Sequence, residues 1–370
     1  MFPKTIKVRW IGPACVVVLC VILALGLWPF YVPRNEVSWA ENQNGLEFGN
    51  HGSAMSVGAL AGPRAGSSCS IEAWIRPANR WHSGTILSFY SADNPQQLSV
   101  HQALTDLMLQ LGTGEQPRVT VAKVYVDEVF RRPGVVLITV TSGVRGTAVY
   151  VNGELVRAFS RFQFGAAACS GRIILADAPL QQDGWAGEAR ALAIYYAELP
   201  ASRVLRHYQA WSNGKQPEIL PEDCNAGLYR FDEHGGRLAH NYAGAGADLT
   251  IPESYTVVDK VFLEPFWEEF EPSWNYVRGI LKNIVGFIPL GFCFYAYFAF
   301  VRRYSRAALV TVLFGFAVSL TIEVLQGYLP TRDSGTTDLI TNTLGTYVGV
   351  LAYQGVMVRV CGRSLDAALW

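Results

Sequence analysis

Long apolar runs alternate along this chain with a middle region of much shorter ones. Four runs approach the roughly 20 apolar residues that a membrane-spanning helix needs, and they cover residues 12–32, 281–301, 307–329 and 338–358. Residues 12–32, 283–301 and 339–358 contain no charged residue, whereas Glu323 interrupts the third run. We therefore predict four transmembrane helices, one of which contains an acidic residue.

The middle region, residues 37–258, has the pattern of a β protein. Short runs alternate or stay apolar between turn-forming residues, and they cover 70–76, 85–90, 119–126, 135–141, 147–151, 172–176 and 189–196. The pair Asn152-Gly153 is a hairpin signal. This pattern predicts an all-β sandwich. Residues 259–280, rich in aromatic and acidic side chains, are predicted to form a juxtamembrane segment.

Composition supports a membrane protein that carries a folded insert. Hydrophobic residues make up 50% of the chain and charged residues 16%, which is low for a soluble protein. The formal net charge is zero, and no long block of lysine and arginine is present. The chain therefore lacks the basic surface typical of nucleic-acid-binding proteins, and we expect no nucleic-acid partner.

Cations near the apolar runs predict the orientation in the membrane, because cytoplasmic loops are rich in lysine and arginine. The cations flank the runs at Lys4, Lys7, Arg9, Arg302, Arg303, Arg306, Arg359 and Arg363. This places residues 1–11 and 359–370 in the cytoplasm and the sandwich outside the cell (inner) membrane. The alternative is that residues 12–32 are a cleaved signal peptide. The run is long for such a peptide and lacks a small-x-small cleavage site.

Export of the insert would permit a disulfide bond. Three of the seven cysteines, Cys69, Cys169 and Cys224, fall in the insert. Cys69 and Cys169 each precede a predicted strand, so we predict a disulfide between these two. No Cys/His spacing suggests a zinc site.

Polar residues gather near the end of the third apolar run and the start of the fourth. A carboxylate inside a membrane is expensive to bury, so it indicates a site unless partners satisfy it. Helical spacing places Gln326 on the Glu323 face and Asn342 on the Asp338 face. The candidate site residues are Asn283, Glu323, Gln326, Arg332, Asp333, Asp338 and Asn342. Two interpretations stay open: a packing device, or a pocket for a headgroup in which Arg332 contacts a phosphate.

Several motifs of the insert occur in the order typical of one fold family. They are GLEFG (45–49), IEAWIRP (71–77), AVYVNGELV (148–156), WAGEARALAIY (185–195) and ELPA (198–201). Together they resemble the laminin G-like, or concanavalin A-like, lectin family. The segments GLYRFDEHGG (227–236) and NYAGAGADLT (241–250) look like the opening of such a domain, yet they come last. The resemblance therefore implies a circularly permuted sandwich.

The lectin resemblance also implies a ligand for the insert, an extracytoplasmic glycan. Trp81, Trp185 and Trp211 are candidate platforms for a sugar, with burial in the core as the alternative. Calcium at the rim of the fold would involve Asp232 or Asp248. A glycosidase of this fold would need paired carboxylates on one strand, and no Glu-x-Asp-x-Glu motif is present.

The membrane part resembles another family. The motifs NIVGFIPLGF (283–292), SLTIEVLQ (319–326), LPTR (329–332) and TDLITNTLG (337–345) are similar to those of the VanZ-like family. That family is named for a protein associated with glycopeptide (teicoplanin) resistance. The resemblance covers about residues 275–355, so the lectin-like domain is an insertion between the first and second helices.

These observations favour a cell-envelope protein that binds a glycan through the sandwich and a lipid or lipid-linked sugar through the helices. The first alternative is a membrane-embedded enzyme in which Glu323 or Asp338 acts as acid or base on a lipid-linked substrate. No His, Ser or Cys nucleophile motif accompanies these acids, so we expect binding rather than catalysis. The second alternative is a transporter or flippase. The oligomeric state stays open.

Overall fold

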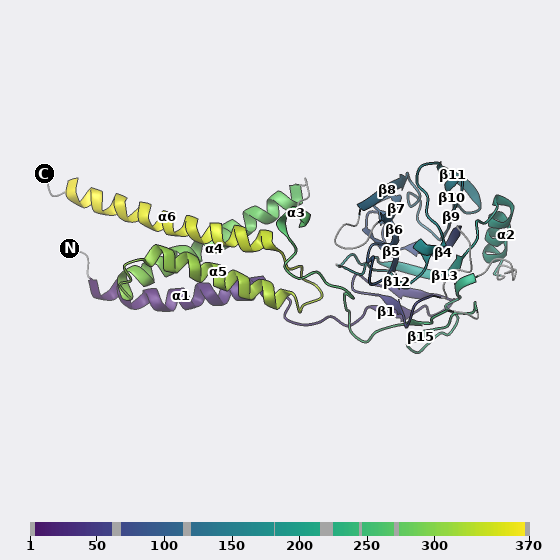
Figure 1. The fold of residues 1–370 in the computed structure, drawn as a ribbon. Helices are drawn as coiled ribbons and strands as arrows, with labels where there is room; N and C mark the ends of the chain where they lie inside the picture. Colours follow the sequence, from purple (N-terminus) through teal and green to yellow (C-terminus); the bar gives the residue numbers. More distant parts are fainter. Residues whose placement is uncertain are drawn as a thin grey trace. The chain divides into compact units, whose positions relative to one another are not determined.

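A computed structural model describes residues 4–60, 68–113, 120–180, 182–214, 225–243, 246–269 and 274–366. The chain forms two compact units: a helical unit made of Met1–Val32 with Val261–Trp370, and a β unit made of Pro33–Lys260. The helical unit is therefore built from both ends of the chain, and the β unit lies between them in the sequence, as Figure 1 shows by its colours.

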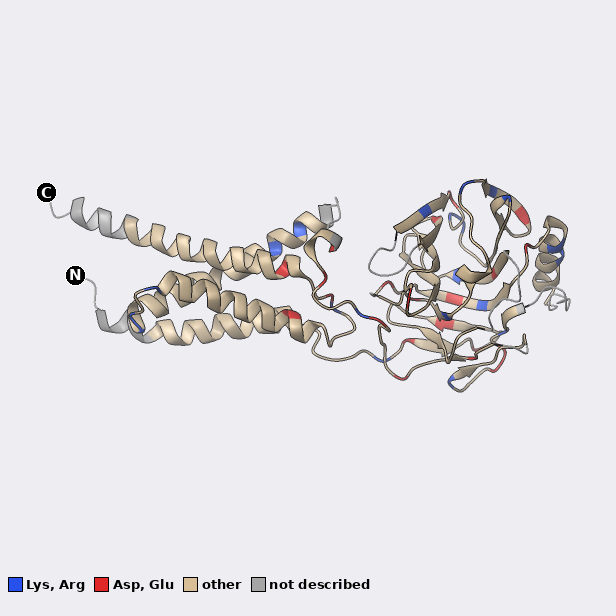
Figure 2. Ribbon diagram, viewed as in Figure 1, with Lys and Arg blue, Asp and Glu red and all other residues tan. Residues whose placement is uncertain are grey.

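Four long helices make up most of the helical unit. They are α1 (Lys4–Leu27), α4 (Trp274–Ala296, continued as a π-helix over Tyr297–Val301), α5 (Ala307–Gln326) and α6 (Thr336–Asp366), with the short α3 (Phe266–Glu269) before α4. Helix α6 packs against α4 and α5, and α1 packs against the same two helices. Figure 2 shows that these helices carry few charged residues over most of their length.

Three stretches within the described residues are long and apolar enough to cross a membrane: Trp10–Leu27, Tyr276–Val301 and Ala307–Gln326. The fourth predicted run, 338–358, lies within α6. Gly345 and Gly349 of α6 lie directly against α4, where a Cβ atom would collide with the carbonyl oxygens of Ile284 and Ile288. These glycines therefore allow the two helices to pack closely, as their GxxxG spacing predicts.

The β unit consists of two antiparallel sheets. The first contains β1 (Val37–Trp39), β2 (Leu46–Phe48), β13 (Gly187–Tyr195), β4 (Cys69–Pro77), β9 (Val136–Gly143), β10 (Gly146–Val151) and β11 (Glu154–Phe159) in that order, with β14 (Asn225–Tyr229) also paired to β13. The second contains β15 (Leu238–Ala239), β16 (Leu249–Thr250), β3 (Ala54–Ser56), β12 (Arg172–Leu175), β5 (Ser83–Tyr90), β6 (Leu98–Ala103), β7 (Asp106–Thr113) and β8 (Thr120–Val126).

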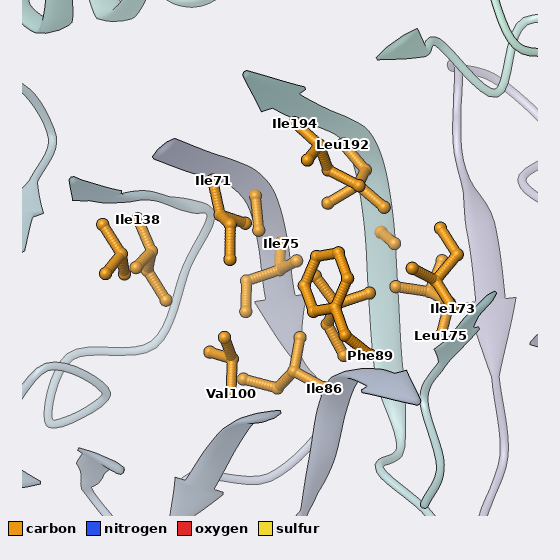
Figure 3. Close-up of a cluster of buried hydrophobic side chains, with 14 of the residues drawn as sticks. Ile71, Ile75, Ile86, Phe89, Val100, Ile138, Ile173, Leu175, Leu192 and Ile194 are labelled. Carbon is orange, nitrogen blue, oxygen red and sulfur yellow. The ribbon is translucent and has the colours of Figure 1, made fainter. Parts of the chain in front are cut away.

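Alternating side chains from both sheets fill the core. In β4, Ile71, Ala73 and Ile75 belong to the main hydrophobic cluster, while Glu72 and Trp74 point to the opposite face. Figure 3 shows the isoleucines of β4 beside Phe89 of β5 and other apolar side chains from both sheets. Helix α2 (Ala201–Ser212) packs near the Trp74 face through Trp211. The prediction of an all-β sandwich is therefore confirmed.

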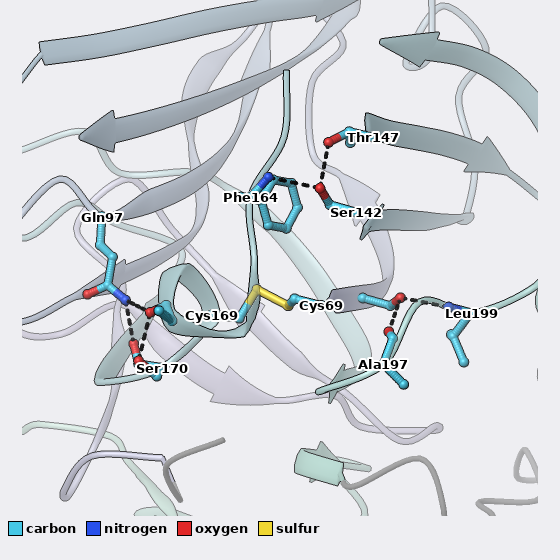
Figure 4. The surroundings of a disulfide bond; sticks show 11 residues. Cys69, Gln97, Ser142, Thr147, Phe164, Cys169, Ser170, Ala197 and Leu199 are labelled. Atoms are coloured by element: carbon cyan, nitrogen blue, oxygen red, sulfur yellow. Dashed lines mark hydrogen bonds between the residues drawn. A yellow bond between two sulfur atoms is a disulfide. The ribbon is translucent and has the colours of Figure 1, made fainter. Parts of the chain in front are cut away.

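A disulfide bond joins Cys69 at the start of β4 to Cys169 in a short 3₁₀ turn, Ala166–Cys169. Figure 4 shows this bond among hydrogen-bonded loops, including the Ser142 hydroxyl between Phe164 and Thr147. This is the pair that the sequence predicted. Cys224 lies outside the described residues.

The final segment of the β unit contributes to both sheets. Strand β14 pairs with β13 in the first sheet, and β16 pairs with β3 in the second. Tyr229 and Phe231 of this segment are fully buried in the core. Strands β14 and β16 of this final segment are therefore part of the two sheets.

Candidate functional site

A cavity of about 200 Å³ lies between the four long helices. Its apolar wall includes Ile22 and Leu25 of α1 and Phe287 of α4. Its polar wall consists of Lys282, Asn283, Glu323, Gln326, Asp338 and Asn342. Every long helix therefore contributes to the lining, and the polar residues come from α4, α5 and α6.

Glu323 lies in the last turn of α5 and is 1% exposed. Its Oε2 accepts a hydrogen bond from the Gly335 amide at 2.9 Å. The Ser334 hydroxyl donates to the Glu323 carbonyl oxygen at 2.9 Å. The loop between α5 and α6 therefore folds back over this carboxylate and fixes its position at the cavity.

Asp338 lies in the first turn of α6, where the partial positive charge of a helix N-terminus favours a carboxylate. Its Oδ1 accepts a hydrogen bond from Asn283 Nδ2 of α4 at 2.6 Å. Glu269 of α3 accepts a hydrogen bond from the Thr337 amide at 2.9 Å. Two carboxylates thus stabilise the start of α6, and one of them also lines the cavity.

The two remaining amides on the polar wall each donate a hydrogen bond. Asn342 Nδ2 donates to the Ser319 hydroxyl at 3.0 Å, and Gln326 Nε2 donates to the Gly26 carbonyl of α1 at 2.8 Å. Asn342 Oδ1 is buried and has no hydrogen-bond partner within the described part of the chain. A buried acceptor without a donor is unfavourable, so this atom marks a place where a ligand or water would be stabilised.

Five of the seven residues predicted for the site therefore meet around one cavity. The other two, Arg332 and Asp333, do not line it. Arg332 Nε donates to the Trp28 carbonyl at 2.8 Å and Nη2 to the Leu25 carbonyl at 3.4 Å. Arg332 therefore binds the carbonyl end of α1, and Asp333 is exposed. The expected contact of Arg332 with a phosphate inside the cavity does not fit this geometry.

Sequence reasoning missed three contributions to the site. Lys282 lines the cavity next to Asn283 and is itself exposed, and α1 supplies Leu25 and Gly26. Glu269 falls in the predicted juxtamembrane segment and was not predicted to bind the start of α6. Lys282 adjoins a predicted site residue, which is a usable signal. The contribution of α1 depends on contacts between segments some 300 residues apart, which no local pattern reports.

The three tryptophans proposed to stack on sugars differ in accessibility. Trp185 is fully buried, and its Nε1 donates to Gln102 at 2.8 Å. Trp211 is 5% exposed and stacks on Trp74, with ring centroids 6.0 Å apart. These two predictions are wrong because both indoles are part of the core packing. Trp81 is 60% exposed, with the Arg80 guanidinium 5.2 Å from its ring centre.

Protein donors surround the two aspartates proposed to bind calcium. Asp232 accepts a hydrogen bond from the Tyr242 hydroxyl at 2.9 Å, and Asp248 from the Asn241 amide at 2.8 Å. Among the residues that the structure describes, no group of three or more His, Cys, Asp or Glu side chains could hold a metal ion. The prediction of calcium at Asp232 or Asp248 is therefore not supported by a ligand set.

A larger cavity, about 590 Å³, lies in the β unit and was not predicted. The strand register places Glu47, Glu188 and Arg76 in one row across β2, β13 and β4, and all three line this cavity. Arg76 pairs with Glu188 at 2.6 Å, and Arg190 binds the other Glu188 oxygen at 2.9 Å. A row of charged groups with both donors and acceptors suits a hydroxyl-rich ligand.

Ser99, His101 and Asp183 lie in the order of a nucleophile, a base and an acid. Ser99 Oγ is 2.7 Å from His101 Nε2, and His101 Nδ1 is 3.3 Å from Asp183. Thr85 Oγ1 bridges the imidazole and the carboxylate. Ser99 and His101 are only 7% and 8% exposed, however. This exposure is small for a nucleophile that must meet a substrate, so we interpret the group as a hydrogen-bonded network that stabilises the second sheet.

Comparison with solved structures finds distant likenesses over about half of the chain. The binding domain of Paraclostridial Mosquitocidal Protein 1 is 12% identical, with a TM-score of 0.38, over 49% of this chain and 47% of that one. A putative carbohydrate-binding protein from Bacteroides ovatus is 12% identical, with a TM-score of 0.35, over 55% and 61%. The matches thus span about half of each structure, and similarity at this level carries no functional argument. No curated protein matches the chain.

The family comparison concerns the other unit. Residues 243–359 match the VanZ/LLP1 family model. This range contains α4 and α5 and most of α6, and with them nearly all of the polar wall of the cavity. It also includes the whole stretch of about residues 275–355 whose motifs resemble that family. The chain is therefore a membrane protein that carries a VanZ-like domain at residues 243–359, joined to an antiparallel β-sandwich.

Proposed function

We propose that this protein acts in the cell envelope by holding the headgroup of a membrane lipid or lipid-linked sugar in its helical unit. The observation that carries the proposal is the cavity of about 200 Å³ between α1, α4, α5 and α6, with Glu323 buried in its wall. Carboxylates at this depth in apolar helices are expensive and usually face an interior or wet site.

The alternative is that the polar residues only hold the helices together. A packing device of this kind would bring donors and acceptors into full contact, because an unpaired buried polar atom destabilises the fold. The cavity leaves room beside Glu323 and Asp338, and Asn342 Oδ1 lacks a donor among the described residues. Both features favour a bound group over a closed network.

The proposed arrangement has four membrane spans, at 12–32, 281–301, 307–329 and 338–358, with both termini in the cytoplasm. The end of α5 and the start of α6 would then lie at the outer face of the membrane, and the cavity with them. Phe262, Phe266 and Trp267, all at least half exposed, precede α4. Large aromatic side chains favour the headgroup layer, so these three would mark the same outer surface.

We also propose that the sandwich binds an extracytoplasmic glycan. Two features support this proposal: the exposed Trp81 and the cavity of about 590 Å³ lined by Glu47, Arg76 and Glu188. An indole face and paired charged groups are the contacts that sugars use. Circular permutation of the sandwich is part of this proposal, supported by the strand pairing of residues 225–250. A role in glycopeptide resistance would follow if the glycan or lipid were a cell-wall precursor.

An enzymatic function is the second candidate, because Glu323 and Asp338 line one cavity and could act as acid and base. The described lining residues include no Ser, Cys or His nucleophile. Glu323→Gln separates the possibilities. An enzyme would lose turnover of a lipid-linked substrate, a binding protein would lose its ligand, and a packing device would lose stability.

The test is native mass spectrometry of the full protein purified in detergent, with Glu323→Gln beside the wild type. Thr321→Ala is a matched control, because Thr321 lies on the same helix, is exposed and donates to the Ala317 carbonyl of that helix. We expect co-purified lipid or lipid-linked sugar in the wild type and the control, and its loss from Glu323→Gln with little change in melting temperature. Absence of any retained ligand, with lowered melting of Glu323→Gln, would contradict the proposal.

A further inference from the structure

We infer that the cavity between α1, α4, α5 and α6 binds a primary ammonium group, such as that of an aminated headgroup, and not a phosphate. This inference rests on the headgroup site proposed above and names the chemistry of its ligand. It follows from three features of the cavity: the charge of its wall, the state of the nearby backbone amides and the unpaired side-chain acceptor.

The charged groups of the wall favour a cation. Two carboxylates, Glu323 and Asp338, line the cavity, and Lys282 is the one cation among the described lining residues. Lys282 is exposed, whereas Glu323 is 1% exposed. Arg332, which the sequence suggested as the phosphate contact, instead donates to carbonyl oxygens at the end of α1. A phosphate would therefore meet two acidic groups with one solvated cation to offset them.

Three backbone amides at the start of α6 are already engaged. A helix N-terminus usually offers free amides to a phosphate, and α6 begins beside the cavity. The Gly335 amide donates to Glu323, the Thr336 amide to the Glu264 carbonyl and the Thr337 amide to Glu269. The protein's own oxygen atoms therefore already accept from three of the amides that an anion would use.

The unpaired group on the wall is an acceptor. Asn342 is 5% exposed, and its Oδ1 has no partner within the described residues. A primary ammonium carries three N–H donors, which matches the number of acceptor groups, this oxygen and the two carboxylates. A trimethylated ammonium has the same charge but no donor, and a sugar hydroxyl has a donor but no charge. Of these three groups, only the primary ammonium supplies both properties.

Lys282 would then face the rest of the headgroup. It is exposed and lines the cavity next to Asn283, so a phosphate attached to the ammonium group could lie near it, outside the carboxylates. This arrangement fits a zwitterionic headgroup with the amine inside and the phosphate outside. Replacing Lys282 would weaken retention of the lipid without changing the preference for a headgroup with a primary ammonium group.

The experiment compares lipids that differ only in the headgroup. The full protein in detergent is titrated with phosphatidylethanolamine, phosphatidylcholine and phosphatidylglycerol, and the bound fraction is measured by native mass spectrometry. We expect phosphatidylethanolamine to bind about tenfold more tightly than the other two, the ratio expected for charge-assisted hydrogen bonds that they cannot make. Glu323→Gln should remove this preference, while Thr321→Ala should keep it.

Lys282→Gln is the second variant, chosen because an exposed side chain can be replaced without unfolding. This variant should weaken the binding of all three lipids while keeping the preference for phosphatidylethanolamine. If it abolished that preference, the cation would be the selecting group and the inference would be overturned. In a separate titration, free ethanolamine is added as a competitor to the protein with bound phosphatidylethanolamine. Competition by this compound would show that the ammonium group suffices for recognition and would support the inference for soluble amines also.

The outcomes separate this inference from the proposed function. If the wild type bound phosphatidylglycerol as tightly as phosphatidylethanolamine or more tightly, and Glu323→Gln lost this binding, the ammonium inference would be overturned. The proposed headgroup site would still stand. No headgroup preference in the wild type, and no effect of Glu323→Gln on lipid retention, would overturn both.

Discussion

The two units of this protein each bury a glutamate, and the surroundings of the two side chains differ. In the β unit, Glu72 is fully buried and accepts hydrogen bonds from Thr139 at 3.1 Å, Tyr195 at 2.9 Å and His207 at 2.8 Å. In the helical unit, Glu323 is almost as buried but adjoins a cavity. A buried acid with converging donors stabilises a fold, whereas one beside an open space is available to a ligand.

The largest expected effect is the loss of the Glu72 network. Glu72→Ala would leave His207, Tyr195 and Thr139 buried without their shared acceptor, and we expect a loss of about 3–5 kcal/mol in the unfolding free energy of the β unit. Urea denaturation of the full protein, followed by tryptophan fluorescence, measures it. Glu47→Ala, at an exposed position of β2, is the control and should change the value by less than about 0.5 kcal/mol. A loss below about 1 kcal/mol for Glu72→Ala would mean that the hydrogen bonds around Glu72 contribute little to the stability of the β unit.

The disulfide supports the same unit by a different mechanism. It closes a loop with a sequence separation of 100 between Cys69 and Cys169, so its loss would mainly give the unfolded chain more freedom. We expect the double variant Cys69→Ala with Cys169→Ala to lose about 2–5 kcal/mol. The same denaturation, run on wild type with and without reductant, checks this value. Retained lipid binding by the reduced protein would show that the helical unit acts without the full stability of the sandwich.

Asp177 provides a pH-dependent test of burial in the β unit. Desolvation raises the pKa of this 1% exposed carboxyl to about 6, although hydrogen bonds from Tyr255 and from the Asp183 and Ala178 amides oppose the shift. The folded state therefore keeps its proton longer than the unfolded state. The resulting loss of stability develops as pH rises from about 4 to 6 and persists above that range.

Replacement by asparagine should remove this pH dependence. Asp177→Asn keeps an acceptor for both amides and should gain up to about 2–3 kcal/mol above pH 6, with the gain disappearing near pH 4. Unfolding free energies measured between pH 4 and pH 8 test the sign. A gain that grew towards acid pH would mean that the folded state favours the charged form.

The smallest effect on stability is expected for Glu323→Gln. Glutamine keeps an oxygen that can accept from Gly335, so the α5–α6 loop should stay in place. We expect a change within about 1 kcal/mol in stability, together with loss of the retained lipid. The measured melting temperature would contradict the ligand interpretation if it fell as far as that of Glu72→Ala.

Sequence patterns predicted the parts of the fold that depend on local spacing. Apolar runs located all four long helices, and the spacing of Glu323, Gln326, Asp338 and Asn342 placed these polar residues in one group. Alternation located seven of the sixteen described strands within two residues, such as Ser83–Tyr90 for the run predicted at 85–90. These predictions succeed because the face of a helix or strand on which a residue lies is determined by its spacing from neighbouring residues.

The remaining features depend on which segments meet in space. Arg332 is close to Asp338 in the sequence, yet its guanidinium binds carbonyls of α1 that lie more than 300 positions earlier. Trp211 is buried because α2 lies against the sheet and stacks it on Trp74. The local sequence around an arginine or tryptophan is the same whether the side chain contacts a ligand or packs within the protein. Its burial and its partners, which depend on the fold, distinguish these two roles.

The most direct test of the account compares the two glutamates in one experiment, with melting temperature and lipid retention measured on the same samples of Glu72→Gln and Glu323→Gln. We expect Glu72→Gln to melt several degrees lower and keep its lipid, and Glu323→Gln to melt like the wild type and lose its lipid. If Glu323→Gln also melted lower and kept the same lipid as the wild type, the polar cluster of the helical unit would be a packing device.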